Sequence, residues 1–342
     1  MQETGTLFRA LELGALDKTL VRLYGADRLE ENKIRYAAVI AGYTKTFGSP
    51  PQALFSAPGR TELGGNHTDH QHGRVLAASI NLDIIAAVAP NRSGMVRVQS
   101  EGYPMDVVDL CELAPRSEES NHSASLVRGV VARFSALGCP LQGGGFDAYT
   151  LSKVPGGSGL SSSAAFEVLV GTILNELFWQ GRATPVEIAQ IGQYAENVYF
   201  GKPCGLMDQA ACSVGGVVAI DFADNAHPVV QQIDFDLAAT GHALCILDSG
   251  AGHADLTAEY AAITDELGAV CRCFGKSVLR EIPEAQFMAR LPEVRRAVGD
   301  RAVLRALHIY GENERAHAQA DALRTGDFTR FLALSRESGR SS

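Results

Sequence analysis

The stretch P-G-G-S-G-L-S-S-S-A-A-F-E-V-L-V, residues 155–170, joins a glycine-rich loop to the beginning of a helix. After the serines, apolar side chains recur every four residues at Ala165, Leu169, Ile173 and Leu177, which form one face of a helix. Serine hydroxyls are typical N-caps, because they accept hydrogen bonds from the free N–H groups of the first helical turn. The stretch therefore predicts a loop that runs directly into a helix N-terminus.

Such a loop has two features that suit a phosphate group. Backbone N–H donors converge on it, and the helix dipole places partial positive charge at the same end. It lacks the Lys-Ser/Thr ending of a Walker A motif and the G-x-G-x-x-G spacing of a dinucleotide-binding fold. Glycine-rich turns before ordinary helices are also common, so composition alone leaves a flexible turn as an equal alternative.

Length and composition describe an ordinary globular chain. The 342 residues suggest about two domains, and 46% hydrophobic residues supply ample core. The formal net charge of -9 argues against a nucleic-acid partner or an acidic membrane surface. An acidic protein can still bind ATP where the site is locally positive or uses magnesium.

The cysteines and the N-terminus bear on the compartment. Seven cysteines at irregular spacing, with no C-x-x-C pair, indicate neither a disulfide framework nor a zinc site. The N-terminal residues lack the basic start and apolar core of a signal peptide, and no apolar run is long enough to span a membrane. We expect a reduced, cytoplasmic protein without nucleic-acid or membrane partners, and a monomer as the working assumption.

The remaining pattern alternates helices and strands. Residues 16–24, 34–47, 125–137, 186–200 and 255–274 read as helices, and further helices follow residue 283. Strands are expected at 54–57, 75–89 (or a bent pair), 95–99, 105–110, 145–151 and 242–247, with a strand–turn–strand at 214–222. The alternation predicts a mixed, α+β layer architecture.

A polar segment precedes the apolar run at residue 75. It contains Arg60 and, further on, His67, Asp69, His70 and His72. The histidine spacing matches no helical i, i+4 pair, so we favour recognition of a polyhydroxylated ligand over a metal site. Arg60 can place a delocalised positive charge near a phosphoryl group. A solvated polar loop is the alternative.

Two carboxylates follow the glycine-rich loop in sequence. Glu196 and Asp208 stand twelve residues apart with Gly201, Pro203 and Gly205 between them, so they share no helix face but could converge through the intervening turn. A phosphate loop with two carboxylates has what magnesium and a hydroxyl nucleophile require, because one carboxylate can ligate the ion while the other activates the alcohol. Taken alone, the two residues are better explained as an exposed Glu and a capping Asp.

Three segments together resemble the galactokinases, a family of GHMP-superfamily sugar kinases. They are S-A-P-G-R at 56–60 with H-T-D at 67–69, the serine-rich stretch at 155–165, and G-K-P-C-G-L-M-D-Q at 201–209. A fourth match is looser, through His253 and the Glu259–Tyr260 pair. The resemblance extends from about residue 10 to the end of the chain and keeps the family's order.

The resemblance implies ATP-dependent phosphorylation of the anomeric (C1) hydroxyl of galactose, giving galactose 1-phosphate. It implies a two-domain GHMP-kinase fold, with domains at residues 1–213 and 214–342 and the active site between them. By motif, Arg60 and Asp208 are the catalytic pair, and Ser162 and Glu196 hold Mg²⁺. The implied sugar contacts are Asn66, His67, Asp69, Gly205 and Tyr260. The implied phosphate-binding residues are Gly156, Gly157, Ser158, Gly159, Leu160, Ser161, Ser162 and Ser163.

Two departures from the family pattern open alternatives. The family signature G-R-x-N-L-I-G-E-H-T-D-Y has a glutamate, a sugar contact toward C6, where this chain has Asn66. A carboxylate would repel an anionic C6 group whereas Asn66 can donate to one, so galacturonic acid or another C6-modified sugar is an alternative substrate. The family's third glycine-rich motif and closing strand do not occur in these residues, so we expect an incomplete second domain.

A non-catalytic regulator that responds to sugar and ATP is a further alternative. Arg60, Ser162, Glu196 and Asp208 are all present, so nothing in the implied catalytic set is disabled. An enzyme is therefore the favoured reading.

Overall fold

The computed structural model describes residues 5–66, 68–141, 143–247 and 257–342. Packing divides the chain into two units, described separately below. The first unit is Met1–Gly59 with Ile80–Ser213, and the second is Arg60–Ser79 with Val214–Ser342. Residues 60–79, which we assigned to the N-terminal domain on sequence grounds, thus pack with the second unit. Strands β1 (Ala53–Gly64) and β2 (Arg74–Asn91) each contribute to both.

The sheet of the first unit has the order β4-β3-β5-β2, with β1 paired to β2. Its other strands are β3 (Met95–Ser100), β4 (Met105–Asp109) and β5 (Gly145–Ser152). The β2–β5 and β3–β4 pairs are antiparallel, and β3–β5 is parallel. The run at 75–89 is one long strand, not a bent pair.

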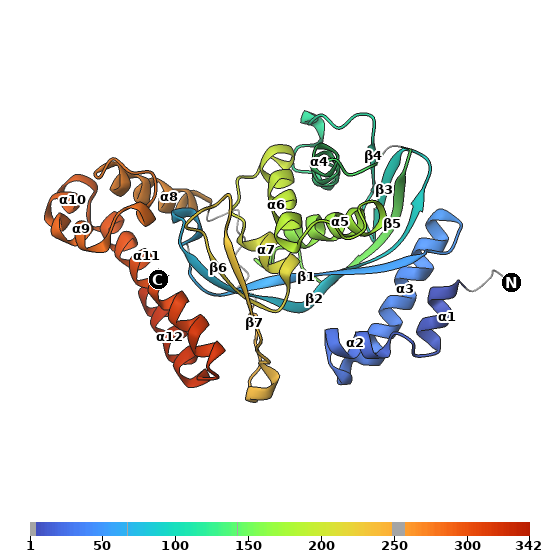
Figure 1. The fold of residues 1–342 in the computed structure, drawn as a ribbon, viewed down its shortest axis with the longest axis horizontal. Coiled ribbons are helices and arrows are strands. Elements are labelled where there is room, and N and C mark those ends of the chain that lie inside the picture. Colours follow the sequence, from blue (N-terminus) through green and yellow to red (C-terminus); the bar gives the residue numbers. More distant parts are fainter. Residues whose placement is uncertain (1–4, 67, 142, 248–256) are drawn as a thin grey trace. The chain divides into compact units, whose positions relative to one another are not determined.

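Both faces of this sheet are covered by helices, as Figure 1 shows. One face packs on α4 (Ser123–Ala136), α5 (Ser162–Phe178) and α6 (Pro185–Ala195), and the other on α1 (Thr6–Glu12), α2 (Asp17–Tyr24) and α3 (Leu29–Phe47). Side chains alternate between the faces of a strand. In β2, Ile84, Ala86 and Val88 accordingly join the α4–α6 core, whereas Ile85, Ala87 and Ala89 join the α1–α3 core. A strand buried on both faces reads as a continuous apolar run, which is why β2 shows no alternation in sequence.

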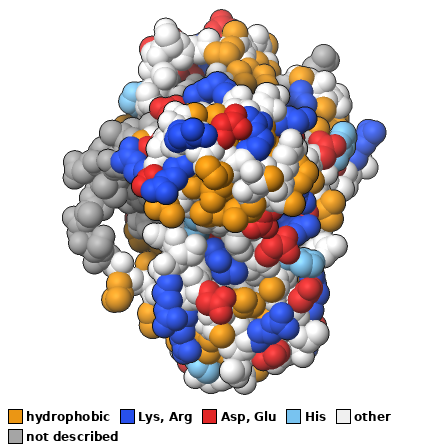
Figure 2. Space-filling model, turned by 90° about the vertical axis from the view of Figure 1, so that its left-hand side faces the viewer, with side chains coloured by type: hydrophobic (Ala, Val, Ile, Leu, Met, Phe, Trp, Pro, Cys, Tyr) orange, Lys and Arg blue, Asp and Glu red, His pale blue; other side chains and the backbone are white. Residues whose placement is uncertain are grey.

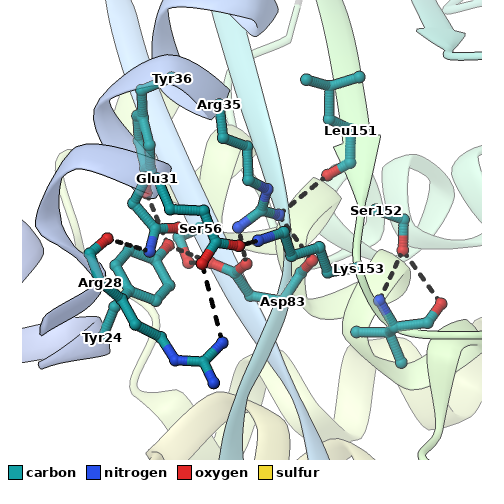
Figure 3. A network of polar contacts seen from close by, with 12 residues as sticks. Tyr24, Arg28, Glu31, Arg35, Tyr36, Ser56, Asp83, Leu151, Ser152 and Lys153 are labelled. Atoms are coloured by element: carbon teal, nitrogen blue, oxygen red, sulfur yellow. Dashed lines mark hydrogen bonds and ion pairs between the residues drawn. The ribbon is translucent and has the colours of Figure 1, made fainter.

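A buried ion pair ties α3 to β2 (Figure 3). The Asp83 carboxylate accepts a hydrogen bond from the Arg35 guanidinium at 2.5 Å, and Arg35 also donates to the Asp83 carbonyl at 2.9 Å. The hydroxyls of Tyr24 and Ser56 donate to the other carboxylate oxygen. Both charged side chains are buried and therefore lose their hydration on folding. The hydrogen bonds of this cluster take the place of that hydration.

The second unit combines a small sheet with a helical array. Residues 74–78 of β2 pair antiparallel with β6 (Val217–Asp221), which pairs antiparallel with β7 (Val229–Ile233). The helices are α8 (Thr257–Arg272), α9 (Glu284–Ala289), α10 (Leu291–Val298), α11 (Asp300–Arg324) and α12 (Phe328–Ser341). One core joins α8 to α11, and a second joins the sheet to α11 and α12.

Figure 2 views the molecule from the side on which α9 and α10 lie in Figure 1. Among the coloured side chains of this face, Lys and Arg are intermixed with Asp and Glu, and apolar side chains lie between them. Interspersed charges of both signs produce no extended positive potential. This described face therefore lacks the continuous basic surface that nucleic acid requires.

Three predicted elements differ from the structure. The strand–turn–strand at 214–222 is wrong, because α7 (Met207–Val214) ends there and only β6 follows the turn at Gly215 and Gly216, whose φ values are 76° and 68°. The strand at 242–247 is also wrong: these residues form no regular element, and Leu247 is 92% exposed. The helix at 186–200 divides into α6 and a π-helical turn, Glu196–Phe200. Within the described residues, no helix combines the length and apolarity needed to cross a membrane.

Candidate active site

The glycine-rich loop leaves β5 after Ser152 and enters α5 at Ser162 in the first unit. Gly157 and Gly159 adopt φ values of 71° and 75°, in the left-handed region that favours glycine. A Cβ atom on Gly156 or Gly157 would meet no atom within 4 Å. The loop backbone therefore borders open space that a ligand can fill.

The glycine of the S-A-P-G-R segment brings β1 against this loop. A Cβ atom on Gly59 would lie 2.7 Å from the Leu160 carbonyl oxygen and 3.1 Å from a Val154 methyl group. Any larger residue would push the strand and the loop apart, so glycine is required by close approach rather than by backbone angle. Arg60 follows Gly59 directly on the same strand.

The serines at the start of α5 do not cap it. Ser161 is the N-cap residue but no side chain caps the helix, and its hydroxyl donates instead to Asp208 Oδ2 at 2.6 Å. The Ser163 hydroxyl donates to Glu196 Oε1 at 3.0 Å. The predicted capping role is wrong. The first-turn N–H groups are left without a side-chain cap, as an anion site at a helix N-terminus requires.

Glu196 occupies the first position of the π-helical turn, Glu196–Phe200. Its carbonyl accepts hydrogen bonds from the N–H groups of Gly201 and Lys202, both at 3.1 Å, and its buried carboxylate accepts one from Lys202 Nζ at 2.9 Å. Single π turns within helices occur frequently at functional sites. Here the turn holds a buried carboxylate next to the serine-rich helix start.

Asp208 lies in the first turn of α7, and the next residue connects the site to the core. The fully buried Gln209 donates through Nε2 to Glu196 Oε2 at 2.8 Å and to Glu167 Oε2 at 3.0 Å. Glu196 and Asp208 thus contact neighbouring serines of one loop, as the sequence predicted through the intervening turn. Glu167 and Gln209 were missed, although a lone charge among apolar residues in A-A-F-E-V-L-V was a signal.

Glu167 is 1% exposed on α5. Burial raises the pKa of the Glu167 carboxyl well above its usual range, and the nearby charge of Glu196 raises it further. One of its carboxyl oxygens has no hydrogen-bond partner. Burial and the neighbouring Glu196 carboxylate thus both favour the neutral form of the Glu167 carboxyl.

We expect Glu167→Gln to change how stability depends on pH. A carboxyl whose pKa is raised by folding stabilises the protein fully below its unfolded pKa, near 4.5, and this contribution is lost as pH rises toward the folded pKa. The variant should match the parent at acid pH and become relatively more stable as pH rises, by at most about 1.4 kcal/mol per pH unit. Urea unfolding from pH 4 to 9, in buffer that contains a metal chelator, measures the free energy of unfolding of both proteins. Glu176→Gln, at an exposed position on the same helix, is the control. A pH-independent difference would contradict it.

The other candidate residues are distributed as follows. Arg60 lies on β1, half-buried, and Asp69 begins a 3-10 turn, Asp69–Gln71, both in the second unit. The Asn66 side-chain amide donates to Ser342 Oγ at 2.9 Å. Gly205 lies on the segment between the π-helical turn and α7. His67, His253 and the side chain of Tyr260 lie outside the described residues.

The donor set at Glu196 suits magnesium. Mg²⁺ is usually bound through one or two carboxylates plus substrate phosphates and water. The Glu196 carboxylate already faces one cation, the Lys202 ammonium, and one hydroxyl, from Ser163. Ser162 is the first residue of α5, immediately before Ser163. Among the described residues no group of three or more His, Cys, Asp or Glu side chains can hold a metal.

Two family models match parts of this chain. Residues 41–90 match the family model described as the galactokinase galactose-binding signature, and residues 125–216 match that of the GHMP kinases N terminal domain. The first match contains Arg60, Asn66 and Asp69. The second contains the glycine-rich loop, Glu196 and Asp208.

Relatives match over most of the chain. The galactokinase of Streptomyces coelicolor is 34% identical over 292 residues, which are 83% of this chain and 72% of that protein. The human galactokinase is 34% identical over 308 residues, 87% of this chain and 75% of that protein. The solved structure of Lactococcus lactis galactokinase complexed with galactose superposes with a TM-score of 0.71 at 25% identity, covering 90% of this chain and 79% of that one. The expected α+β GHMP-kinase fold is thereby confirmed.

Proposed function

The chain belongs to the galactokinase family, and from this we propose that it transfers the γ-phosphoryl group of ATP to the C1 hydroxyl of galactose, giving galactose 1-phosphate and ADP. The observation that carries the proposal is the pair of serine–carboxylate contacts. Ser161 bonds to Asp208 and Ser163 to Glu196. A phosphate-binding loop and the two carboxylates required for phosphoryl transfer thus share one constellation.

Asp208 is the proposed base or orienting group. In the reaction, the sugar O1 forms a bond to the γ-phosphorus, the bond from that phosphorus to the bridging oxygen of ADP breaks, and the hydroxyl proton passes to an Asp208 oxygen. The Ser161 hydroxyl donates to one oxygen of this carboxylate and so holds the side chain in place. Positioning of this kind accounts for much of the catalysis of phosphoryl transfer.

The nucleotide side of the site is the loop from Gly156 to Ser163. Its backbone N–H groups and the N-terminal end of α5 would bind the phosphates of ATP. Ser162 and Glu196 would hold the magnesium ion, and Lys202 would exchange its contact with Glu196 for one with the nucleotide or solvent. When bound, magnesium neutralises charge on the β- and γ-phosphate oxygens.

The sugar side comprises Arg60 and the segment that follows it. Arg60 would stabilise negative charge on the attacking oxygen and the transferring phosphoryl group. Asn66, His67, Asp69, Gly205 and Tyr260 are the proposed sugar contacts. Asn66 lacks the negative charge of the family glutamate, so a sugar with an anionic C6 group is the competing substrate.

A side-by-side turnover assay tests the proposal. Galactose and galacturonate are each supplied with ATP and Mg²⁺, ADP release is followed, and the product is identified as a 1-phosphate by ³¹P NMR. We expect clear preference for galactose. Preference for galacturonate would show that the substrate is a C6-modified sugar and not galactose. If no sugar tried led to ADP release while the protein still bound sugar and ATP, the non-catalytic regulator would be favoured.

A further inference from the structure

Two consecutive residues of α11 hold the two ends of the loop between β1 and β2. This loop, residues 65–73, carries Asn66 and Asp69, and it belongs with α11 to the second unit. No local sequence pattern links the helix at residues 300–324 to the site. The geometry of the described residues does.

Glu312 holds the beginning of the loop. Its carboxylate oxygen Oε1 accepts hydrogen bonds from the N–H groups of Gly65 at 3.0 Å and Asn66 at 3.4 Å. The Ser338 hydroxyl of α12 donates to the same oxygen at 2.7 Å, and Arg315 Nε donates to Oε2 at 2.7 Å. Burial by itself would raise the pKa of Glu312, but these hydrogen bonds lower it below its usual range, so the carboxylate is ionised.

Asn313 holds the end of the loop. Its Oδ1 accepts from the N–H of Arg74, the first residue of β2, at 2.8 Å. The approach is close, because a Cβ atom on Gly73 would lie 2.4 Å from that same Oδ1. It would also lie 2.4 Å from Thr68 Cβ and 2.7 Å from the Thr68 carbonyl oxygen, so Thr68 and Asn313 together require glycine at this position.

A third contact fixes the 3-10 turn inside the loop. The buried Gln71 accepts through Oε1 from the N–H of Leu279 at 2.9 Å. Thr68, also buried, has its hydroxyl 2.9 Å from the Gly65 carbonyl and 2.6 Å from the Arg74 carbonyl. The loop is thus held at its beginning, its middle and its end.

Burial of the polar side chains that hold the loop lowers the free energy of unfolding. Glu312 is 0% exposed, and a buried charge is tolerated only when it is fully hydrogen-bonded. Apolar residues on this face of α11 would pack at lower cost but would leave the loop backbone without partners. Buried polar residues that lower stability in this way occur mostly at functional sites.

We propose that Glu312 and Asn313 are positioning residues for sugar recognition, which fix the backbone of residues 65–74 so that Asn66 and Asp69 meet the sugar in a defined arrangement. The proposal rests on the proposed function. Neither residue needs to touch the substrate. Their removal should weaken sugar binding and leave ATP binding unchanged.

The test compares KM for the sugar with KM for ATP. Glu312→Ala is expected to raise KM for galactose about ten-fold, as loss of a hydrogen bond to a charged group predicts, with KM for ATP within two-fold of the parent. Glu312→Gln keeps an acceptor for the two N–H groups and should restore most of the sugar affinity. Asp321→Ala, which removes an exposed carboxylate of the same helix whose ion-pair partners are His317 and Arg324, is the matched control.

Asn313 gives a second pair of variants in case Glu312→Ala does not fold. Asn313→Ala should raise KM for galactose several-fold, whereas Asn313→Asp retains the Oδ1 acceptor and should not. Hydrogen exchange of the segment 60–74 without substrate should be faster in both alanine variants. An unchanged sugar KM, or equal rises in the sugar and ATP KM values, would overturn the positioning role.

Separate measurements test the positioning role of Glu312 and Asn313 and the proposed function. Turnover of galactose by the parent protein tests the function alone. The variant-to-parent ratio of KM, measured for whichever sugar the parent phosphorylates, tests the positioning role alone, and the exchange experiment reports on the loop without any sugar.

Discussion

Asp208→Asn should lower kcat for galactose phosphorylation by about 10²–10⁴-fold, the range associated with loss of a positioned general base. The substitution removes the proton acceptor and changes the shape of the side chain little. The Ser161 hydroxyl, which lies 2.6 Å from Asp208 Oδ2, can still donate to an amide oxygen. We therefore expect the variant to fold and to bind sugar and ATP normally.

The measurements are steady-state ADP release, calorimetric binding of galactose, and the thermal midpoint. Ser161→Ala is the matched control, because it removes one hydrogen-bond donor to Asp208 and leaves the carboxylate. Its kcat should fall about ten-fold or less, the expected value of one hydrogen bond. An Asp208→Asn variant with kcat within ten-fold of the parent would remove Asp208 from the catalytic role.

Asp83→Ala should destabilise the protein by about 3–5 kcal/mol, the usual cost of breaking a buried ion pair by removing one partner. The Arg35 guanidinium would remain buried without its carboxylate, and the hydroxyls of Tyr24 and Ser56 would lose their acceptor. Figure 3 shows how these groups converge on the one carboxylate. A domain is usually stable by only about 5–15 kcal/mol, so this loss is severe.

Urea unfolding monitored by circular dichroism measures the effect. The control is Asp17→Ala, which removes one of the two carboxylate partners of Lys33, in a partly exposed ion pair at 2.9 Å between α2 and α3. Pairs of this kind contribute about 0–1 kcal/mol. If the two variants lost the same free energy of unfolding, the buried Asp83 cluster would contribute no more to stability than the partly exposed ion pair.

Much of the first unit follows from local sequence. Helical periodicity predicted α3, α4 and α5 to within a few residues. The turn residues between Glu196 and Asp208 indicated that the two carboxylates could converge, and both contact serines of the same loop. The partners of the serine hydroxyls were harder to predict, because a serine at a helix start can cap the helix or donate to another group. Which of the two occurs depends on the carboxylates that the fold brings there. Their positions in the sequence do not distinguish the two.

Other errors have a different cause. Short apolar runs such as 242–247 fit a strand or an irregular segment equally, and the outcome depends on whether a neighbouring strand is available. The roles of Glu312 and Asn313 are contacts across more than two hundred residues of sequence. No window of local pattern reports them.

The division of the chain has a consequence for dissecting the protein. Because residues 60–79 belong to the second unit, the backbone passes from one unit to the other at 59/60, 79/80 and 213/214. A gene cut after codon 213 would therefore not yield two self-sufficient halves. In the N-terminal fragment, residues 74–78 of β2 would lose β6 and expose a sheet edge prone to aggregation. The C-terminal fragment would lack the strand that pairs with β6. During synthesis, the loop that carries Asn66 must likewise wait for α11 to leave the ribosome before it is anchored.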